Sequence, residues 1–295
     1  MAEPTIRQLR YFEALARHGH FGRAAEASSV SQPALSVQIR ELEANLGAAL
    51  FERSARGVRL TAFGQDMSER VRRILRAVDE LGAAARTAQG VLSGRLRLGV
   101  IPTVGPYLLP AMIRRIGRDY PDLDLDIRET ITPRLIEELG AGRLDAAIVA
   151  LPIPEPNLTA LPLFEEAFLL VRPSGDAGTP IPAGENLPKM RLLLLEEGHC
   201  FRDQALSFCS LQTAAPRHGM DGSSLSTLVQ MVGAGLGVTL IPEMAVAVET
   251  RSAAVAIDRF PEPQPSRKIG LVWRKSSPLA EQLTELGAVL ARVGD

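Results

Sequence analysis

Cysteine, histidine and tryptophan are all scarce in this chain of 295 residues, which contains two, four and one of them, respectively. Two cysteines cannot form a disulfide scaffold, and four scattered histidines without ligand spacing argue against a metal site. The sequence also lacks an apolar run near the roughly 20 residues of a membrane span, and an apolar signal core at its amino terminus. We therefore expect a cytoplasmic protein with reduced thiols, no metal, no cofactor and no membrane attachment.

A surplus of charge is also absent, because 33 lysines and arginines face 34 aspartates and glutamates, for a formal net charge of -1. Overall charge therefore predicts no polyanionic partner, and any sign of DNA binding must be local. Phosphate loops and nucleophile elbows are missing as well. The glycine-rich segment 233–237 follows a predicted helix and precedes a predicted strand, the reverse of a dinucleotide fingerprint. These absences argue against an enzyme of those classes.

Both cysteines lie in one segment, 192–209. Its four leucines predict a buried strand, and the apolar spacing of its last five residues predicts a short helix. Cys200 would lie just before that helix, where unsatisfied N–H groups and the helix dipole favour a thiolate. His199 and Arg202 can add positive charge there, whereas Cys209 is predicted to be buried.

The spacing of the cysteines decides what a bond between them would mean. Nine residues at helical rise place the two Cα atoms roughly 13 Å apart on opposite faces of a helix. A disulfide needs a Cα separation of roughly 4.4–6.8 Å. A Cys200–Cys209 bond would therefore require the helix to unravel, and it would act as a conformational switch. The alternative is two unrelated thiols, one of which is core packing.

The first 64 residues have the pattern of a helix-turn-helix. A first helix is predicted at about 7–17, a second begins at Phe21, and a third runs from about 32 to 46. Ser31 is the predicted N-cap of the third helix. Two short helices joined by a tight turn are typical of DNA-binding modules, although an ordinary helical hairpin would give the same pattern.

The third helix favours DNA binding. Leu35, Ile39 and Leu42 form its predicted inner face, which leaves short polar side chains near its start to reach base edges in a major groove. Two predicted strands, 51–53 and 58–60, form a wing whose arginines suit phosphate contacts. The candidate DNA-binding residues are Ser31, Gln32, Pro33, Ala34, Ser36, Gln38, Arg40, Arg53 and Arg56.

A long helix is predicted from Thr61 to about Gln89. Its apolar stripe consists of Met67, Val71, Ile74, Leu75, Val78 and Leu81. Such a helix needs a partner helix if the stripe is exposed, or it packs on its own domain. Residues 90–94 are a predicted hinge. We therefore expect a DNA-binding domain at 1–64, a linker and dimerisation segment at 65–93, and a regulatory domain at 94–295.

Strands and helices alternate from Arg95 onward, which predicts a doubly wound α/β domain whose chain crosses into a second lobe at about Leu170. The predicted strands are 95–100, 123–127, 146–149, 192–195, 237–241 and 268–273, and the predicted helices are 108–118, 133–139, 224–234 and 278–293. Two such lobes form a cleft, and ligands bind beyond the carboxyl ends of the strands. Thr103, Thr132 and His199 would lie at that edge.

The amino-terminal residues resemble the winged helix of LysR-type transcriptional regulators. The matching residues are Leu9-Arg10-Tyr11-Phe12, Ala24-Ala25, Val30-Ser31-Gln32-Pro33-Ala34-Leu35-Ser36, Ile39-Arg40-Glu41-Leu42-Glu43, Leu46-Gly47, Leu50-Phe51-Glu52-Arg53, Leu60-Thr61 and Gly64. The resemblance implies a bacterial DNA-binding domain whose third helix enters the major groove. It also implies antiparallel dimerisation through the long helix, and a type 2 periplasmic-binding fold for the remaining chain.

Within that family, Gly198-His199-Cys200-Phe201-Arg202-Asp203-Gln204-Ala205, Phe208-Cys209 and Ile269-Gly270-Leu271-Val272 resemble the hydrogen-peroxide-sensing OxyR branch. The resemblance implies that peroxide oxidises Cys200 to a sulfenic acid, which Cys209 resolves as a disulfide. The implied peroxide pocket consists of Thr103, Thr132, His199 and Asp203. The resemblance also implies that Arg267 helps to hold Cys200 as a thiolate. The implied partners are promoter DNA, RNA polymerase, a thiol-disulfide reductant and further copies of the chain in a dimer of dimers.

Three functions are compatible with these patterns. The first is a redox-controlled transcription factor that responds to hydrogen peroxide and is not an enzyme. The second is a LysR-type regulator that binds a small organic anion between its lobes and has structural cysteines. The third is a thiol peroxidase, which would turn over many times with a dithiol reductant. The first function accounts for both the cysteine segment and the winged helix, and we expect it to be correct.

Overall fold

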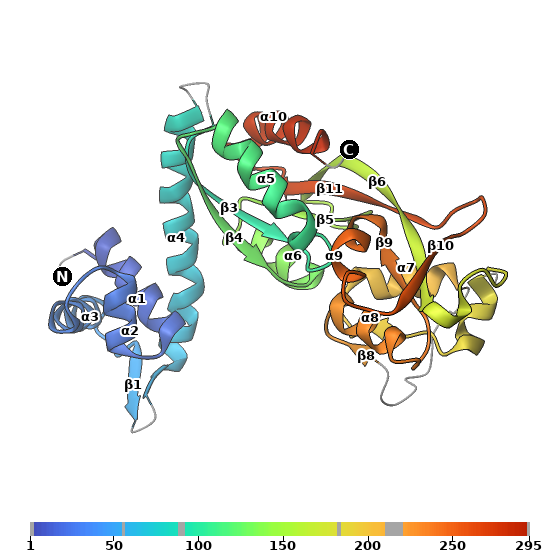
Figure 1. Ribbon diagram of the computed structural model, residues 1–295. Coiled ribbons are helices and arrows are strands. Elements are labelled where there is room, and N and C mark those ends of the chain that lie inside the picture. Colours follow the sequence, from blue (N-terminus) through green and yellow to red (C-terminus); the bar gives the residue numbers. More distant parts are fainter. Residues whose placement is uncertain (1–2, 55–56, 88–91, 182–183, 210–220, 294–295) are drawn as a thin grey trace. The chain divides into compact units, whose positions relative to one another are not determined.

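The computed structural model in Figure 1 describes residues 3–54, 57–87, 92–181, 184–209 and 221–293. The chain divides into two compact units, Met1–Ala85 and Arg86–Asp295, which are described separately below. Within the described ranges, none of the helices is both long enough and apolar enough to cross a membrane.

The first unit contains three short helices and a two-stranded wing. Its elements are α1 (Ile6–His18), α2 (Phe21–Ala27), α3 (Gln32–Leu46), β1 (Phe51–Ser54) and the antiparallel β2 (Gly57–Leu60). Ser31 caps α3, because its Oγ accepts the backbone N–H of Ala34 at 3.4 Å. Gly47 ends the helix in the left-handed region, with φ of 70°. The predicted winged helix-turn-helix is confirmed.

The predicted inner face of α3 forms the centre of this unit. Leu35, Ile39 and Leu42 are all buried in one core with Phe12 and Leu15 of α1. The wing is tied to the same helix by a side chain. The carboxylate of Glu43 accepts the backbone N–H groups of the two residues at 50 and 51, at 2.8 and 3.2 Å. The outer face of α3 is therefore held on a rigid support.

The long helix α4 (Ala62–Thr87) uses its apolar stripe in two ways. Val71 and Leu75 are only 6% and 5% exposed, because they pack into the core of the first unit. Ile74 and Leu81 are 45% and 74% exposed. Val71 and Leu75 of the stripe therefore pack on the helix's own domain, whereas Ile74 and Leu81 do not. Of the predicted hinge, residues 90 and 91 lie outside the described ranges.

The second unit is a two-lobed α/β structure around a mixed sheet. Its elements in order are β3 (Gly94–Val100), α5 (Gly105–Asp119), β4 (Leu123–Glu129), α6 (Thr132–Gly140), β5 (Ala146–Leu151), β6 (Leu158–Pro173), η1 (Ser174–Asp176), η2 (Gly184–Met190), β7 (Leu194–Leu195), α7 (Cys200–Phe208), β8 (Asp221–Gly222), α8 (Leu225–Gly233), β9 (Thr239–Pro242), η3 (Glu243–Ala245), α9 (Val246–Glu249), β10 (Val255–Arg259), β11 (Ser266–Arg274) and α10 (Ala280–Ala291). The strand order is β10-β6-β11-β5-β3-β4, and β9 also pairs with β6. The predicted α/β class is confirmed.

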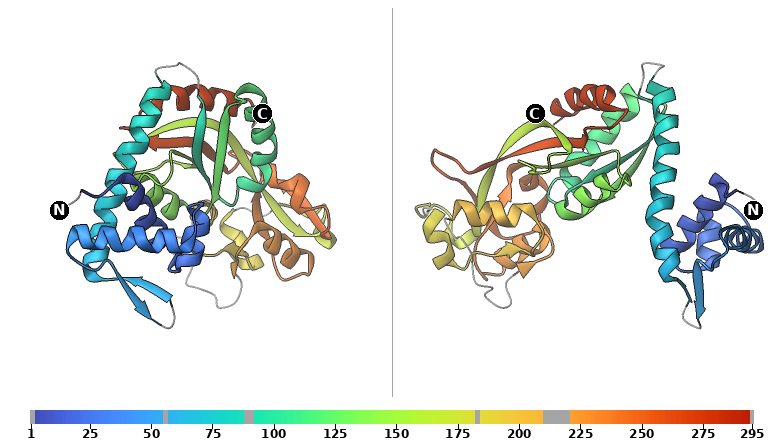
Figure 2. Two further views of the ribbon diagram at one scale, coloured as in Figure 1. Left: turned by 90° about the vertical axis from the view of Figure 1, so that its left-hand side faces the viewer. Right: turned by 180° about the vertical axis from the view of Figure 1, so that it is seen from behind.

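Strand β6 has 16 residues. Figures 1 and 2 show it running as one continuous strand from one lobe into the other. Its first part pairs with β11 as far as Ala167, and its pairing with β9 and β10 begins at Phe168 and Leu169. The crossing therefore comes about two residues before the predicted Leu170. A continuous strand is thus shared by both lobes, which fixes how residues of β11 face the second lobe.

Strand β10 was not predicted from the sequence. Its residues include Asp258, an unfavourable residue in strands. The carboxylate of Asp258 pairs with the Nε of Arg172 at 2.7 Å, and the arginine side chain is only 1% exposed. Arg172 and Asp258 lie on the neighbouring strands β6 and β10. Their cross-strand ion pair therefore stabilises a strand that the local sequence does not favour.

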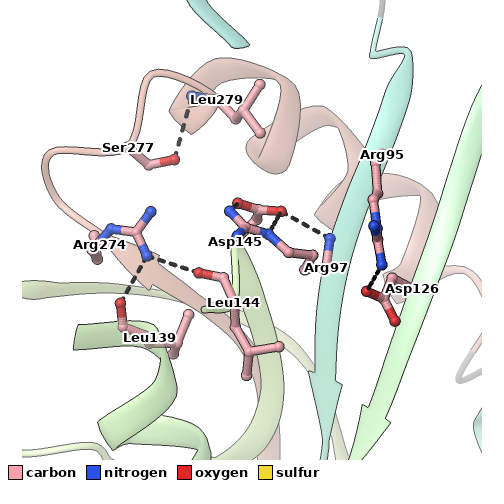
Figure 3. A network of polar contacts seen from close by, with 9 residues as sticks. All are labelled: Arg95, Arg97, Asp126, Leu139, Leu144, Asp145, Arg274, Ser277 and Leu279. Carbon is pink, nitrogen blue, oxygen red and sulfur yellow. Dashed lines mark hydrogen bonds and ion pairs between the residues drawn. The ribbon is translucent and has the colours of Figure 1, made fainter. Parts of the chain in front are cut away.

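Figure 3 shows the polar network that ties the first lobe together. The carboxylate of Asp145 accepts the backbone N–H of Arg97 at 2.8 Å and two side-chain N–H groups at 3.1 and 2.7 Å. Arg274 donates to the carbonyls of Leu139 and Leu144, at 2.7 Å each. The Asp145 contacts lie just before the amino end of β5, and the Arg274 contacts lie at and after the carboxyl end of α6. They hold the parallel strands in register, so the carboxyl ends form a fixed edge.

Candidate functional site

The helix that contains the cysteines begins earlier than predicted. α7 starts at Cys200 instead of Ala205, with His199 as its N-cap. The polar run after Phe201 hides the helical spacing in the sequence, but Phe201 and Arg202 are both buried and fix the amino end of the helix. The structure therefore places Cys200 in the first turn of a helix, where its backbone dipole stabilises negative charge.

Cys209 lies at the opposite end of α7, as its C-cap. Its backbone N–H donates to the carbonyl of Ala205 at 3.1 Å, and the residue is 2% exposed. Both cysteines are free thiols. The helical rise between them corresponds to a Cα separation of about 13 Å, well beyond disulfide range. The predicted buried position of Cys209 is confirmed.

Burial raises the pKa of the Cys209 thiol from its ordinary 9.0 to about 11. The folded protein thus holds this proton more tightly than the unfolded chain. The stability that the protonated thiol contributes is fully present below about pH 9 and is lost as pH rises through about 11.

In a Cys200→Ser variant, we expect alkylation of Cys209 by iodoacetamide to be slow at neutral pH and to increase up to about pH 11. Mass spectrometry of timed samples measures the rate. The same variant unfolded in urea is the control, and its labelling should level off near the ordinary thiol pKa. Equal rates for the folded and unfolded variants at pH 8 would contradict a buried thiol.

Two charges expected beside Cys200 take other roles. Arg202 donates through Nη1 to the carbonyl of Leu195 at 2.6 Å and pairs with the carboxylate of Asp221 at 3.0 Å. It therefore anchors α7 to β7 and β8, and makes no hydrogen bond or ion pair with Cys200. Burial lowers the pKa of His199, which favours the neutral imidazole. The prediction that His199 adds a positive charge is therefore wrong.

Arg267 is the centre of a buried polar cluster with Thr103 and Glu166. Its Nη1 donates to the Thr103 hydroxyl at 2.8 Å, and its Nη2 donates to the Thr103 carbonyl at 2.9 Å. Its Nε donates to Glu166 at 2.8 Å. The guanidinium carbon also lies 5.5 Å from the ring centroid of Phe201, the residue after Cys200. The strand ends of one lobe thus meet the start of α7 in the other.

Thr132 is the first residue of α6, and its buried hydroxyl has no hydrogen-bond partner among the residues that the structure describes. The loop before α6 lies against the loop before α7, since a Cβ built on Gly198 would be 2.8 Å from the Ile131 side chain. His199 and Thr132 each follow one of these touching residues. Asp203, by contrast, is exposed, and within the described chain it forms no hydrogen bond or ion pair with the other predicted pocket residues.

Sequence reasoning missed three residues of this site. Glu166 is 9% exposed and pairs with Arg267, and Phe201 is 3% exposed beneath the guanidinium. The side-chain oxygen of Gln204, one helical turn after Cys200, is buried without a described partner. A run of polar residues after a cysteine was the only signal for Gln204. Nothing local in the sequence marks Glu166.

The carboxyl end of α7 is held by aromatic packing. The rings of Phe208 and Phe260 meet edge to face with centroids 4.9 Å apart. A Cβ on Gly184 would be 2.9 Å from the Phe208 carbonyl and 3.0 Å from its ring, so only glycine allows this close approach. Phe208 and Cys209 belong to the core of the second lobe, and this contact keeps the buried thiol in place.

The candidate DNA-binding residues of α3 are available on the surface. Of those residues, Ser31, Gln32, Pro33, Ala34 and Arg40 are exposed, and Ser36 and Gln38 are half-buried. The Arg40 Nε donates to the Ser36 carbonyl at 3.3 Å, which orients its side chain along the helix. Arg56 and the side chain of Arg53 lie outside the described parts. A helix with this exposed polar face fits a major groove.

Comparison with known proteins shows the same two-part organisation. The family model "Bacterial regulatory helix-turn-helix protein, lysR family" matches residues 6–65, and the model "LysR substrate binding domain" matches residues 89–295. A probable hydrogen peroxide-inducible genes activator of Streptomyces viridosporus is 44% identical over 98% of this chain and 94% of its own. The DNA-binding transcriptional dual regulator OxyR of Escherichia coli K12 is 41% identical, over 98% and 96%.

Solved structures give a similar result. A full-length OxyR variant from Pseudomonas aeruginosa matches with a TM-score of 0.75 and 37% identity, over 98% of this chain and 95% of that one. A peroxide-bound OxyR variant from Corynebacterium glutamicum matches with a TM-score of 0.68 and 37% identity, over 99% and 93%. The chain therefore belongs to the LysR family of bacterial transcriptional regulators.

Proposed function

We propose that this regulator senses hydrogen peroxide through Cys200 and Cys209. The observation that carries the proposal is their position at opposite ends of one helix, with Cys200 at the positive end and Cys209 buried at the other. Relatives named as regulators of peroxide-inducible genes, at 41–44% identity over nearly the whole chain, support the same function.

The chemistry proceeds in two steps. The Cys200 thiolate attacks one peroxide oxygen, the O–O bond breaks, and the leaving hydroxide takes up a proton to become water. The resulting sulfenic acid is then attacked at sulfur by the Cys209 thiolate. The S–O bond breaks, the leaving hydroxide takes up a proton to become a second water, and a disulfide forms. A cellular thiol-disulfide reductant returns both thiols and resets the sensor, and one peroxide is consumed for each signal.

The pocket residues suit the first step. The Thr103 hydroxyl accepts a hydrogen bond from Arg267, which leaves its own proton free to donate to peroxide. The Thr132 hydroxyl is buried and unpartnered among the described residues, so it offers a second polar contact. His199, as a neutral imidazole, can accept or donate there. Asp203 carries its exposed charge at the outer side of the helix start.

The second step requires α7 to unravel. Closing a gap of about 13 Å to disulfide range breaks helical hydrogen bonds and pulls Cys209 from the core. Arg202 would lose its hydrogen bond to Leu195 and its ion pair with Asp221, the two contacts that join α7 to β7 and β8. We infer that the second lobe reshapes its surface as a result, and that this changes how paired regulatory domains sit in a dimer of dimers.

The DNA-bound form follows from the same proposal. Residues 1–64 form the DNA-binding domain, 65–93 the linker and dimerisation segment, and 94–295 the regulatory domain. Exposed Ile74 and Leu81 on α4 provide an apolar surface for a partner helix. Residues of α3, together with Arg53 and Arg56 of the wing, contact promoter DNA in the cytoplasm. The oxidised tetramer then alters its contact with RNA polymerase at oxidative-stress genes.

Phe260→Ala should accelerate disulfide formation several-fold, because it removes the ring that holds Phe208 at the end of α7. Quenched-flow samples analysed by mass spectrometry give the rate. In a Cys209→Ser background the oxidation of Cys200 should be unchanged. Phe164→Ala, which removes a ring from β6 outside that core, is the matched control. An unchanged rate of disulfide formation in Phe260→Ala would show that the Phe208–Phe260 contact does not limit the unravelling of α7.

Peptide mapping after one equivalent of hydrogen peroxide tests the function itself. Trypsin cleaves after Arg202, so residues 192–202 and 203–217 carry one cysteine each and a disulfide links two separate peptides. We expect this linked pair in oxidised wild type and its disappearance on reduction. Two fully alkylatable cysteines after peroxide would instead favour a small organic ligand between the lobes. Repeated turnover with a dithiol reductant would indicate a peroxidase.

A further inference from the structure

Glu166 and Arg267 form a buried ion pair at the point where β6 leaves the first lobe. The two residues are direct cross-strand partners in the antiparallel β6–β11 register. Their side chains are 7% and 0% exposed, and the Arg267 Nη2 is 2.7 Å from Glu166 Oε1. The other carboxylate oxygen, Oε2, accepts the backbone N–H of Met244 from the second lobe at 3.3 Å. Glu166 is therefore fixed from both lobes.

The carboxylate determines how the guanidinium lies. Nε and Nη2 converge on Glu166 Oε1, while Nη1 and Nη2 reach Thr103. A guanidinium is planar, so contacts on two of its edges remove its freedom to rotate. Its central carbon is then held over the ring of Phe201, the residue after Cys200, 5.5 Å from the ring centroid. Without the Glu166 carboxylate, Thr103 would be the remaining hydrogen-bond partner of the guanidinium among the described residues, and the plane could tilt.

The carboxylate also limits the charge that Arg267 presents. An uncompensated cation in a buried site strongly stabilises a neighbouring thiolate. A more stabilised thiolate is a weaker nucleophile, because nucleophilicity falls together with basicity. A neighbouring carboxylate therefore lets Arg267 act as a hydrogen-bond donor with most of its charge offset.

We propose that Glu166 is a positioning residue for the reaction of Cys200 with peroxide, acting through Arg267. This inference rests on the proposed function. Arg267 of β11 is the charged group that packs on the start of α7, and Glu166 pairs with it from β6. The other titratable groups around the site are Tyr107 from α5 with its hydrogen-bond partner Glu249 from α9, Glu129 from β4, and Glu196, His199 and Asp203 from the α7 segment.

The test compares Glu166→Gln and Glu166→Asp with wild type, all in a Cys209→Ser background that isolates the first step. Rates of Cys200 oxidation by peroxide are measured between pH 4 and 9. For Glu166→Gln we expect the plateau rate to fall about tenfold through loss of an aligned donor. The pH of half-maximal rate should be lower than in wild type, because the unbalanced cation favours the thiolate. Glu166→Asp keeps the charge, so its half-maximal pH should stay while its plateau falls less.

Glu165→Gln is the matched control, because it removes the same charge from the next residue of β6, where the side chain is exposed and accepts from Ser266. Its rates should equal those of wild type. Iodoacetamide labelling of Cys200 separates positioning from general damage, since a merely structural role would slow both reagents equally. A wild-type plateau and pH profile in Glu166→Gln would overturn the proposal. A wild-type Cys200 no faster with peroxide than free cysteine would overturn the proposed function, and this inference with it.

Discussion

Cys200→Ser is expected to abolish the peroxide-dependent change in the DNA footprint completely. Serine is nearly the same size as cysteine, and residue 200 is half-buried at the helix start, so the fold should be retained. A hydroxyl is not oxidised by peroxide, and without the first sulfenic acid no disulfide follows. DNase footprints on a promoter fragment that the reduced wild type protects, taken with and without peroxide, measure the effect.

Cys209→Ser separates the two steps of this response. That variant keeps the reactive thiol, so it should consume one equivalent of peroxide while its footprint stays that of the reduced protein. The buried hydroxyl that replaces the thiol is a small change within the second-lobe core. A footprint that still shifts in Cys200→Ser would show that the response does not depend on this thiol, and the redox proposal would fail.

Arg267→Met is expected to destabilise the regulatory unit by about 3–5 kcal/mol, because it leaves a buried carboxylate without its cation. Glu166 is 9% exposed, and its carboxylate would still accept a hydrogen bond from the backbone N–H of Met244. The variant also removes both donors to Thr103. Urea unfolding of the reduced protein, followed by circular dichroism, gives the change in free energy of unfolding.

The double variant Arg267→Met/Glu166→Gln provides the matched comparison. Removing both charges should recover most of the lost stability, since a neutral amide costs far less to bury than an unpaired carboxylate. The interaction energy from the four variants then measures the pair itself. Additive losses in the double variant would show that the two side chains do not interact in solution.

Local signals predicted the first unit well. The ends of α3 agree with prediction because Ser31 and Gly47 are strong cap residues that act within one turn of chain. The same reasoning missed the start of α7. Its first residues are held by the buried Arg202 and its long-range partner Asp221, and such a contact leaves no periodic pattern in the sequence.

The candidate site was predictable only in part, for the same reason. Thr103 follows a predicted strand, so its place at the carboxyl edge of the sheet follows from topology. Its contact with Arg267 depends on residues 164 positions apart. Glu166 required the register of β6 against β11, which hydrophobic alternation does not specify between strands so distant in sequence.

Under the proposed function, the burial of Cys209 also sets the timing of the response. A sulfenic acid on Cys200 has competing fates, since reductants restore it and further peroxide oxidises it irreversibly. Which fate prevails depends on how often α7 opens before a competing reagent arrives. In this proposal, the rate at which α7 opens locally determines how long the sulfenic acid persists before a disulfide forms. Selection on peroxide threshold would then act on packing residues such as Phe208 and Phe260, far from the thiol that meets the oxidant.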